Sequence, residues 1–445
     1  MNKYNPTRTF ESNRTRRYYT FISVLTAIFL PLHALPQSVN QKMTPINDQK
    51  EVSARRIETM RQTIDVLCSS EFSDRLDLDT WRKQQEESAS DTVDGLPPIP
   101  PPIIDIGINT QGAPDAQFFS ELLRAKAAGV EHVVFTGTDS KRNRLGWTRV
   151  REWKALVATE ESQQQDQHHL HLSRRIRSIL PTLHYTAGVH PHQADQCHPE
   201  TLSHIEHYVQ DGDGNAAVAV GECGLDYDRM RSPRQEQLQV FRSLVDMSAR
   251  LQVPLFVHER DRDSGRKEPP LGCCNDLCGI LDDYCGGETP KLDPDKVCIH
   301  CFTGGQTELD AYVSRGYWIG LTGFICMEKR GAKLRQLISD GHLPLDRIMI
   351  ETDAPYMRGD NDYYVPQEMK PPIVSLTPQE EKDNEETTNE KKNSKSKSKR
   401  RRSSKYTQPG DVAAVARALA ELLGVPYSTV CQVTTANAKK FFRLE

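Results

Sequence analysis

From residue 103 onward, short runs of aliphatic and β-branched residues alternate with longer segments of helical periodicity. This alternation is typical of α/β folds in which parallel strands are joined by helices. We expect strands at 103–108, 132–136, 185–189, 217–220, 255–257, 297–299, 317–319 and 348–350. Helices are expected at 116–128, 234–251, 308–315, 334–339 and 411–423. Eight successive βα units favour a (β/α)8 barrel over an open, doubly wound sheet.

Four of the expected strands are closely followed by a side chain that can bind a metal ion. In chain order, these residues are Glu222, His258, His300 and Asp353. Reactive groups of (β/α)8 barrels lie at the C-terminal ends of the strands, so we expect the four residues to meet in space. Carboxylate oxygens and imidazole nitrogens are suitable ligands for Mg²⁺, Mn²⁺ or Zn²⁺.

Two histidines follow the expected strand 185–189. The segment AGVHPHQ contains His190 and His192, and Pro191 stiffens the backbone between them. Either histidine can be a metal ligand or can contact a substrate or its phosphate. For His192, a loop residue without a role in the site is a further alternative. Arg260 is a candidate for holding phosphate oxygens because a planar guanidinium binds them bidentately, with an ordinary surface arginine as the alternative.

Six short motifs occur in a fixed order along the chain: DIGIN, AGVHPH, GECGLD, FVHERD, HCFTGG and ETDAPY. The chain resembles the TatD family of metal-dependent deoxyribonucleases in these motifs, over about residues 103–442. The resemblance implies a TIM barrel of the amidohydrolase-like class and hydrolysis of DNA phosphodiester bonds, with 3′–5′ exonuclease action as the usual description. It also implies metal ligation by Glu222, His258, His300 and Asp353.

The expected mechanism is metal-assisted phosphodiester hydrolysis with one or two divalent ions, Mg²⁺ before Mn²⁺ or Zn²⁺. Glu222 can bridge two ions, and Asp353 is the candidate to orient or deprotonate the attacking water. Many family members carry an H-x-H pair on the first strand, where this chain has Gly107 and Asn109. This difference leaves the number of ions open and makes Asn109 a candidate for substrate binding, together with His190, His192 and Arg260.

Two other function classes remain open on the sequence. A TatD-like hydrolase can act on a different ester or amide, for example as an aminoacyl-nucleic-acid deacylase, with the same barrel and the same metal ligands. A non-catalytic nucleic-acid-binding derivative is the second alternative, and the four intact candidate ligands argue against it. The sequence gives no indication of the preferred strand form or the oligomeric state.

The chain divides into three expected parts. Residues 1–40 resemble a targeting segment, with a basic start and an apolar stretch of about 17 residues that is too short for a stable membrane span. Secretory or plastid entry, mitochondrial import, and an anchored or cytosolic protein are the alternatives for this segment. Residues 41–102 are expected to form a polar linker with one helical stretch at 51–67 and a proline-rich end. The barrel is expected to occupy 103–445.

Two insertions in the barrel have more than one interpretation. The first matters for nucleic-acid binding, because a chain with a formal net charge of −4 can bind nucleic acid only through a local basic patch. The low-complexity segment 379–405 ends in a basic block at 391–405, which can gather DNA, act as a nuclear localisation signal or be a solvated loop. The cysteines at 273, 274, 278 and 285 lack the paired spacing of a zinc site, so a helix with buried thiols is favoured.

Overall fold

The computed structural model describes residues 52–67, 101–158, 176–177, 179–262, 269–359 and 406–445. These residues belong to one compact unit, 51–445. The targeting segment predicted at 1–40 and the charged insertion predicted at 379–405 lie outside the described residues, so both remain predictions. Within the described part of the chain, no helix has the length and apolar character needed to cross a bilayer.

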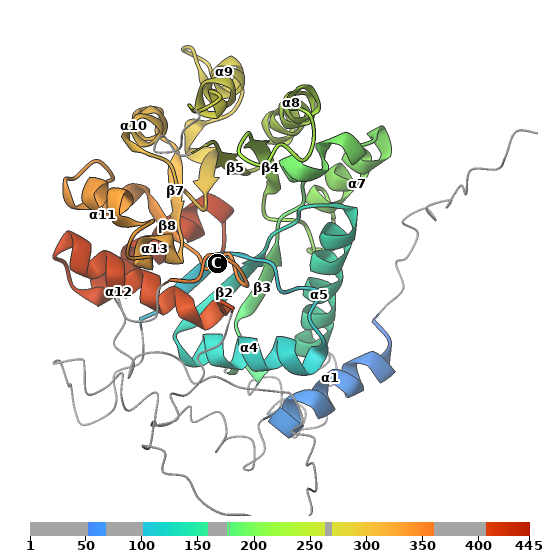
Figure 1. Cartoon of the computed structure of the whole chain (residues 1–445). Coiled ribbons are helices and arrows are strands. Elements are labelled where there is room, and N and C mark those ends of the chain that lie inside the picture. Colours follow the sequence, from blue (N-terminus) through green and yellow to red (C-terminus); the bar gives the residue numbers. More distant parts are fainter. Residues whose placement is uncertain (1–51, 68–100, 159–175, 178, 263–268, 360–405) are drawn as a thin grey trace, which may run out of the picture. The chain divides into compact units, whose positions relative to one another are not determined.

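Eight parallel strands of the described residues form the centre of this unit (Figure 1). They are β1 (Ile103–Ile108), β2 (Val130–Phe135), β3 (Thr182–Tyr185), β4 (Val220–Asp226), β5 (Leu255–Arg260), β6 (Val297–His300), β7 (Trp318–Leu321) and β8 (Ile348–Ile350). Strands β1 to β3 form one sheet and β4 to β8 another, each in sequence order. The two sheets meet at both edges through single bridges, Ile108 with Ala354 and Ala187 with Val220. This arrangement confirms the predicted (β/α)8-type fold, with bridges in place of full ladders at the two junctions.

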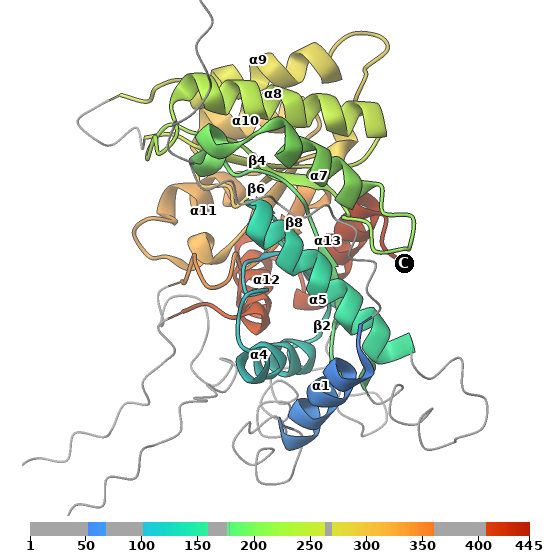
Figure 2. The same ribbon diagram turned by 90° about the vertical axis from the view of Figure 1, so that its right-hand side faces the viewer.

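Helices surround the strands in both views (Figures 1 and 2). They are α1 (Ala54–Leu67), α4 (Asp115–Ala127), α5 (Ser140–Ala158), α7 (Pro199–Val209), α8 (Arg234–Leu251), α9 (Cys273–Cys285), α10 (Gln306–Ser314), α11 (Ala332–Ser339), α12 (Val412–Leu423) and α13 (Tyr427–Phe442). Short 3₁₀ turns are η1 (Pro191–Gln196), η2 (Pro294–Lys296), η3 (Gly323–Cys326), η4 (Leu345–Arg347) and η6 (Pro409–Asp411). The helix predicted for the cysteine group is confirmed as α9, in which Cys273 and Cys278 are buried and Cys274 and Cys285 are partly exposed.

The core fills the space inside the strands and beneath the site. A buried cluster joins side chains from most of the strands to the end of helix α13, including Ile106, Val134, Phe256, Met349 and Phe442. Helix α13 contacts both β1 and β8, so it supports the junction of the two sheets. The packed interior leaves the C-terminal ends of the strands as the place where polar side chains gather.

Strand β4 is longer than predicted and lies further along the chain. It runs from Val220 to Asp226, so Glu222 lies within the strand and not past its end at residue 220. The strand was predicted to end early because glycines such as Gly221 and Gly224 are typical of turns. In the structure they are strand residues with positive φ angles of 144° and 135°. Here they let β4 pass close to the backbone of β5, where a side chain would collide with Phe256 or His258.

Strands β5 and β3 also differ from the prediction. Strand β5 continues to Arg260, so His258 lies inside it, and β3 ends at Tyr185, where the predicted strand began. In β3 the polar residues Thr182 and His184 hide the strand signal, yet both pair in register with β2. The expected order of the elements is nevertheless confirmed, since each of the eight predicted strands has its counterpart.

Helix α1 packs directly on the barrel, although it lies in the region predicted to be a polar linker. It buries Ile57, Met60, Ile64 and Leu67 and contacts α4 and α5. Arg56 bonds to Asp115 at the start of α4, and its Nε lies 2.7 Å from Glu152 Oε1 of α5. The helical stretch predicted at 51–67 is thus present as α1, and because its apolar face is buried against α4 and α5, residues 54–67 are part of the barrel unit and not a linker. The other predicted boundaries remain predictions.

Candidate metal centre

Glu222 of β4 is a buried carboxylate on which three histidines converge. Its Oε1 atom lies 2.9 Å from Nδ1 of His258 and 3.0 Å from Nε2 of His300. The same oxygen lies 3.3 Å from Nε2 of His190. Strands β4, β5 and β6 are neighbours, and the register pairs His258 with His300, so adjacent strands present these side chains together. The structure thus brings together three of the four predicted ligands, with His190 added to them.

The nitrogen atoms of this cluster are well suited to a cation. Nε2 of His258 and Nε2 of His300 are buried and have no aligned hydrogen-bond partner among the described residues. Buried polar atoms in proteins almost always have a partner, so unsatisfied nitrogens beside a carboxylate fit a bound metal ion. One ligand atom each from His190, Glu222 and His258 lies within 4.8 Å of the others. Imidazole and carboxylate side chains at this spacing form a candidate site for a divalent metal ion.

The charges of the cluster depend on one another. Burial alone would raise the pKa of Glu222, but the neighbouring charges of His190 and His300 hold it well below its usual range. Burial favours the neutral form of His258, yet the adjacent carboxylates of Asp226 and Glu222, which stabilise the protonated ring, raise its pKa to about 9. The pKa of His190 falls to about 3 because burial outweighs the attraction of Glu222. The Glu222 carboxylate therefore favours a positive charge at this place, which a metal ion held by neutral histidine rings would supply.

Two further buried carboxylates orient the histidines, and the sequence analysis did not single them out. Asp226, at the end of β4, lies 2.7 Å from His192 Nε2 and 3.5 Å from His258 Nε2. Glu351, directly after β8, lies 3.4 Å from His300 Nδ1 and accepts the backbone N–H of Cys301. Carboxylates in this position fix the ring orientation of metal-binding histidines. Both belong to quoted motifs, GECGLD and ETDAPY, which were the available signal.

Asp353 lies in the same cavity, held by a neighbour from the first strand. Nδ2 of Asn109 donates to Oδ1 of Asp353 at 2.8 Å, so Asn109 is occupied in positioning this carboxylate. Burial raises the pKa of Asp353 to about 7, and the nearby charge of Glu222 adds to this effect. The backbone of Asp353 has a φ of 52°, an uncommon conformation that is frequent at functional sites. The group of closest ligand atoms consists of His190, Glu222 and His258, so Asp353 lies beside this group and not within it.

The predicted substrate-binding residues are found in different environments. His190 belongs to the cluster around Glu222, which favours metal ligation among its alternatives. The ring of His192 is bonded to Asp226 and so supports the site from one side. Arg260 lines the cavity, but its Nε donates to Asp228 at 3.0 Å, so a partner holds it in place.

The cavity around these residues is about 540 Å³ in volume and carries arginines on its rim. The lining cations are Arg142, Arg229, Arg231 and Arg260. Arg142, Arg229 and Arg231 were not predicted from the sequence, because they lie in loops and on helix α5 outside the recognised motifs. A concave site with several guanidinium groups beside a metal-type cluster favours an anionic substrate.

The first strand provides no histidine to the centre. A Cβ atom added at Gly107 would overlap Oε2 of Glu351, so that carboxylate fills the space where a side chain at 107 would begin. Asp105, also buried, accepts the backbone N–H of Thr352 at 2.9 Å and fixes the β1–β8 junction. In β1, Asp105 and Gly107 therefore contact the segment after β8, at Thr352 and Glu351.

Comparison with known proteins agrees with this geometry. A family model described as TatD related DNase matches residues 104–443. The 3'-5' ssDNA/RNA exonuclease TatD of Pectobacterium parmentieri is 28% identical over 346 residues, which cover 77% of this chain and 100% of that protein. The protein of the same name from Salmonella typhimurium is 34% identical over 258 residues, covering 57% of this chain and 80% of that protein.

Solved structures with the same fold include two eukaryotic proteins. A hydrolase of the TatD family from Entamoeba histolytica has a TM-score of 0.56 at 18% identity and covers 78% of this chain and 100% of that chain. An uncharacterized amidohydrolase from Saccharomyces cerevisiae has a TM-score of 0.53 at 20% identity, with coverage of 77% and 100%. At these identities the likeness establishes the fold.

Proposed function

Because this chain belongs to the family of TatD-related DNases, we propose that it is a divalent-metal-dependent nuclease that hydrolyses nucleic-acid phosphodiester bonds. Its relatives from Pectobacterium parmentieri and Salmonella typhimurium are named 3'-5' ssDNA/RNA exonucleases. We therefore take single-stranded DNA or RNA, cleaved from the 3′ end, as the substrate class. The arginine-rimmed cavity supports an anionic polymer as the ligand.

The observation that carries the proposal is the convergence of three imidazoles on one buried carboxylate oxygen, Glu222 Oε1. We assign His190, Glu222, His258 and His300 as the residues that hold the metal ion. When bound, a divalent ion polarises the phosphoryl group and lowers the pKa of a coordinated water. The fixed carboxylates Asp226 and Glu351 keep the histidine rings in the orientation that the ion requires.

Asp353 is our candidate for the proton acceptor of the reaction. Its carboxylate is buried in the cavity, where Asn109 donates to Oδ1, and among the described residues Oδ2 accepts only a weak hydrogen bond from the thiol of Cys301 at 3.7 Å. A general base acts through a direct hydrogen bond of about 3 Å, and it is most effective when its pKa lies near the working pH. The rim arginines compensate the phosphate charge that grows during hydrolysis.

We propose a single ion of the Mn²⁺ or Zn²⁺ type at this centre. Three imidazoles and one carboxylate form a nitrogen-rich set, whereas Mg²⁺ prefers oxygen ligands and retains several waters. A second ion would need ligands from β1, and that strand presents only Gly107 and Asn109, of which Asn109 is bonded to Asp353. The sequence predicted Mg²⁺, so the experiment described next compares Mg²⁺ with Mn²⁺ and Zn²⁺.

Hydrolysis by the purified full-length chain tests the proposal. The protein is stripped with EDTA, then supplied with Mg²⁺, Mn²⁺ or Zn²⁺, and given 5′-labelled single-stranded DNA, single-stranded RNA or duplex DNA. We expect a ladder that shortens from the 3′ end of the single strands, with Mn²⁺ or Zn²⁺ more effective than Mg²⁺. Intact substrates with all three metals would refute the nuclease assignment.

A further inference from the structure

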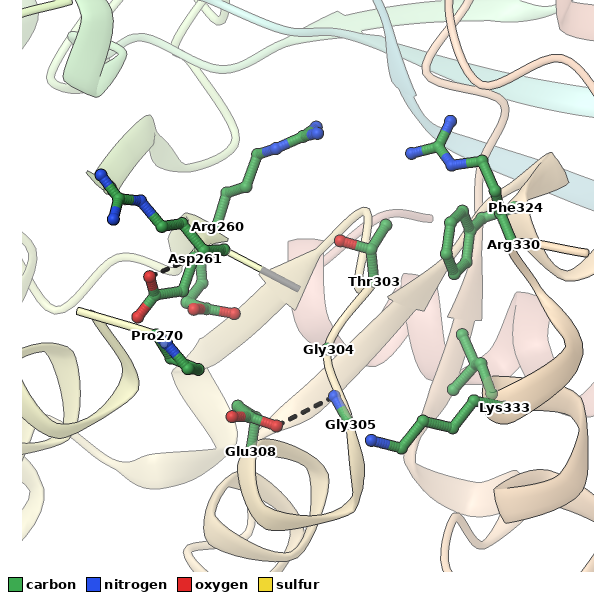
Figure 3. A pocket seen from close by; sticks show the side chains of 13 residues that line it. Arg260, Asp261, Pro270, Thr303, Gly304, Gly305, Glu308, Phe324, Arg330 and Lys333 are labelled. Atoms are coloured by element: carbon green, nitrogen blue, oxygen red, sulfur yellow. Dashed lines mark hydrogen bonds between the residues drawn. The ribbon is translucent and has the colours of Figure 1, made fainter. Parts of the chain in front are cut away.

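A second pocket adjoins the cavity of the metal centre. It has a volume of about 230 Å³ and shares Glu259, Arg260 and Thr303 with that cavity. Its floor is the segment 303–305, which joins β6 to α10, and its walls come from the end of β5 and from the η3–α11 region. Figure 3 shows Arg260 and Asp261 on one side of the pocket and Arg330 and Lys333 on the other. A ligand that spans the shared residues can therefore occupy both spaces.

The pocket contains two cations without an acidic partner. Among the described residues, neither Arg330 nor Lys333 forms an ion pair, and both side chains are exposed. The guanidinium of Arg330 lies over the ring of Phe324, 5.4 Å from its centre. Lys333 extends toward Gly305 (Figure 3), where an added Cβ would lie 2.7 Å from its Nζ. Both cations thus line the pocket without a direct ion pair.

Two of the acids that line the pocket are already bonded to backbone donors. Asp261 accepts the backbone N–H groups of Arg262, Leu271 and Cys273 at 2.7 to 2.9 Å. Glu308 accepts the N–H of Gly305 at 2.9 Å, which caps helix α10. These carboxylates shape the loops around the pocket, and Oε2 of Glu308 lies near the same position at Gly305 as Nζ of Lys333. The third lining acid, Glu259, is buried.

We propose that this pocket binds a backbone phosphate of the nucleic-acid strand, at the linkage next to the one that is cleaved. The inference rests on the proposed nuclease function, because the metal centre defines which linkage is cleaved. Contacts to backbone phosphates position a strand without reading its sequence, as an exonuclease of broad specificity requires. Arg330 and Lys333 supply the positive charge of the pocket.

A substrate that lacks one charge tests this assignment. A short single-stranded DNA is prepared with a neutral methylphosphonate at the linkage adjoining the 3′-terminal one, and its binding to the full chain is compared with that of the ordinary strand. Fluorescence anisotropy in EDTA measures both dissociation constants without turnover. We expect the wild type to bind the neutral strand about tenfold more weakly, the effect of one lost charge-assisted contact.

The variants R330A/K333A and K329A complete the experiment. Lys329 is exposed and next to Arg330 in sequence, but it does not line the pocket, so K329A removes one neighbouring positive charge, as each single variant does, without touching the pocket. We expect K329A to keep the tenfold preference and R330A/K333A to lose it. The single variants R330Q and K333Q replace the double variant if it fails to fold, and each should reduce the preference.

The outcomes separate this inference from the nuclease proposal. Equal preference in the wild type and in R330A/K333A would overturn the phosphate site, whatever the activity. A wild type that discriminates between the two strands but cleaves neither with any metal would support the binding site and refute the nuclease function.

Discussion

Glu222 provides the negative charge around which the groups of the metal centre are arranged. The variant E222Q keeps the shape of the side chain and removes that charge. We expect metal affinity and turnover of single-stranded DNA each to fall by at least about 100-fold, because even an outer-shell partner of a metal ligand is worth about 10- to 100-fold. Metal titration by calorimetry and a gel assay of cleavage measure the two effects. The control is E200Q, on the exposed start of α7, which should match the wild type.

Asp226 is expected to act through the histidines that it holds. The variant D226N keeps the size of the side chain but weakens the contacts with His192 and His258. We expect metal affinity to fall by about 10- to 100-fold while the fold is retained, since an outer carboxylate fixes ring orientation and raises ligand basicity. Calorimetric titration with Mn²⁺ checks the affinity and circular dichroism checks the fold. An unchanged dissociation constant would show that Asp226 has no part in the centre.

At the residue scale, the sequence predicted the identity of the ligands better than their grouping. Glu222, His258 and His300 were found because each ends a recognisable apolar run. Glu351 was missed, because in ETDAPY the spacing does not show which of two acids faces the histidines and which faces the open cavity. Glu351 can face the histidines because Gly107 has no side chain to occupy the space of its carboxylate. Gly107 and Glu351 are more than two hundred positions apart in the sequence.

At the element scale, strands β2 and β3 contain a histidine pair that makes stability depend on pH. Nδ1 of His132 and Nε2 of His184 are 3.0 Å apart. Burial lowers the pKa of His132 to about 4 and that of His184 to about 3. In the unfolded chain both values are near 6.5, so below that pH the unfolded chain takes up protons that the folded chain does not. The free energy of unfolding should fall from pH 6.5 to about 4, by up to about 1.4 kcal/mol per pH unit for each histidine.

Urea denaturation of the wild type and of H184Q at pH 7.5, 6.5, 5.5 and 4.5 measures this effect. The variant lacks one of the two titrating groups, so its curve of stability against pH should be flatter below pH 6.5. The difference between the two curves reports the contribution of His184, separated from the other groups that titrate in this range. Parallel curves would mean that the strand histidines do not carry the proton uptake.

The elements that the sequence placed least well are those where tertiary contacts override local preference. Helix α8 was predicted with its observed limits, 234–251, because its apolar periodicity and its ends are local features. Strand β4 was placed too early, because Gly221 and Gly224 are turn residues by local preference and strand residues only beside β5. The shift matters for function, since it places Glu222 inside the sheet, where three strands can surround it.

At the scale of the whole molecule, the account predicts different effects from two truncations. Removal of residues 1–40 should leave stability and turnover unchanged, because this segment precedes every described element. Removal of residues 1–95 also removes α1, and with it the buried face at Ile57, Met60, Ile64 and Leu67 and the contacts of Arg56 with α4 and α5. We expect the second truncation to lower the thermal midpoint by at least several degrees. Equal melting curves for the two truncated chains would show that α1 contributes nothing to the barrel.

The most direct test of the central claim is to locate a bound ion by anomalous diffraction from crystals grown with Mn²⁺. Our account predicts one strong peak about 2.0 to 2.3 Å from Glu222 Oε1 and from ring nitrogens of His190, His258 and His300. The same crystals of E222Q should show no peak at that place. A Mn²⁺ peak held by other residues, or an unchanged peak in E222Q, would contradict the assignment of this cluster as the metal centre.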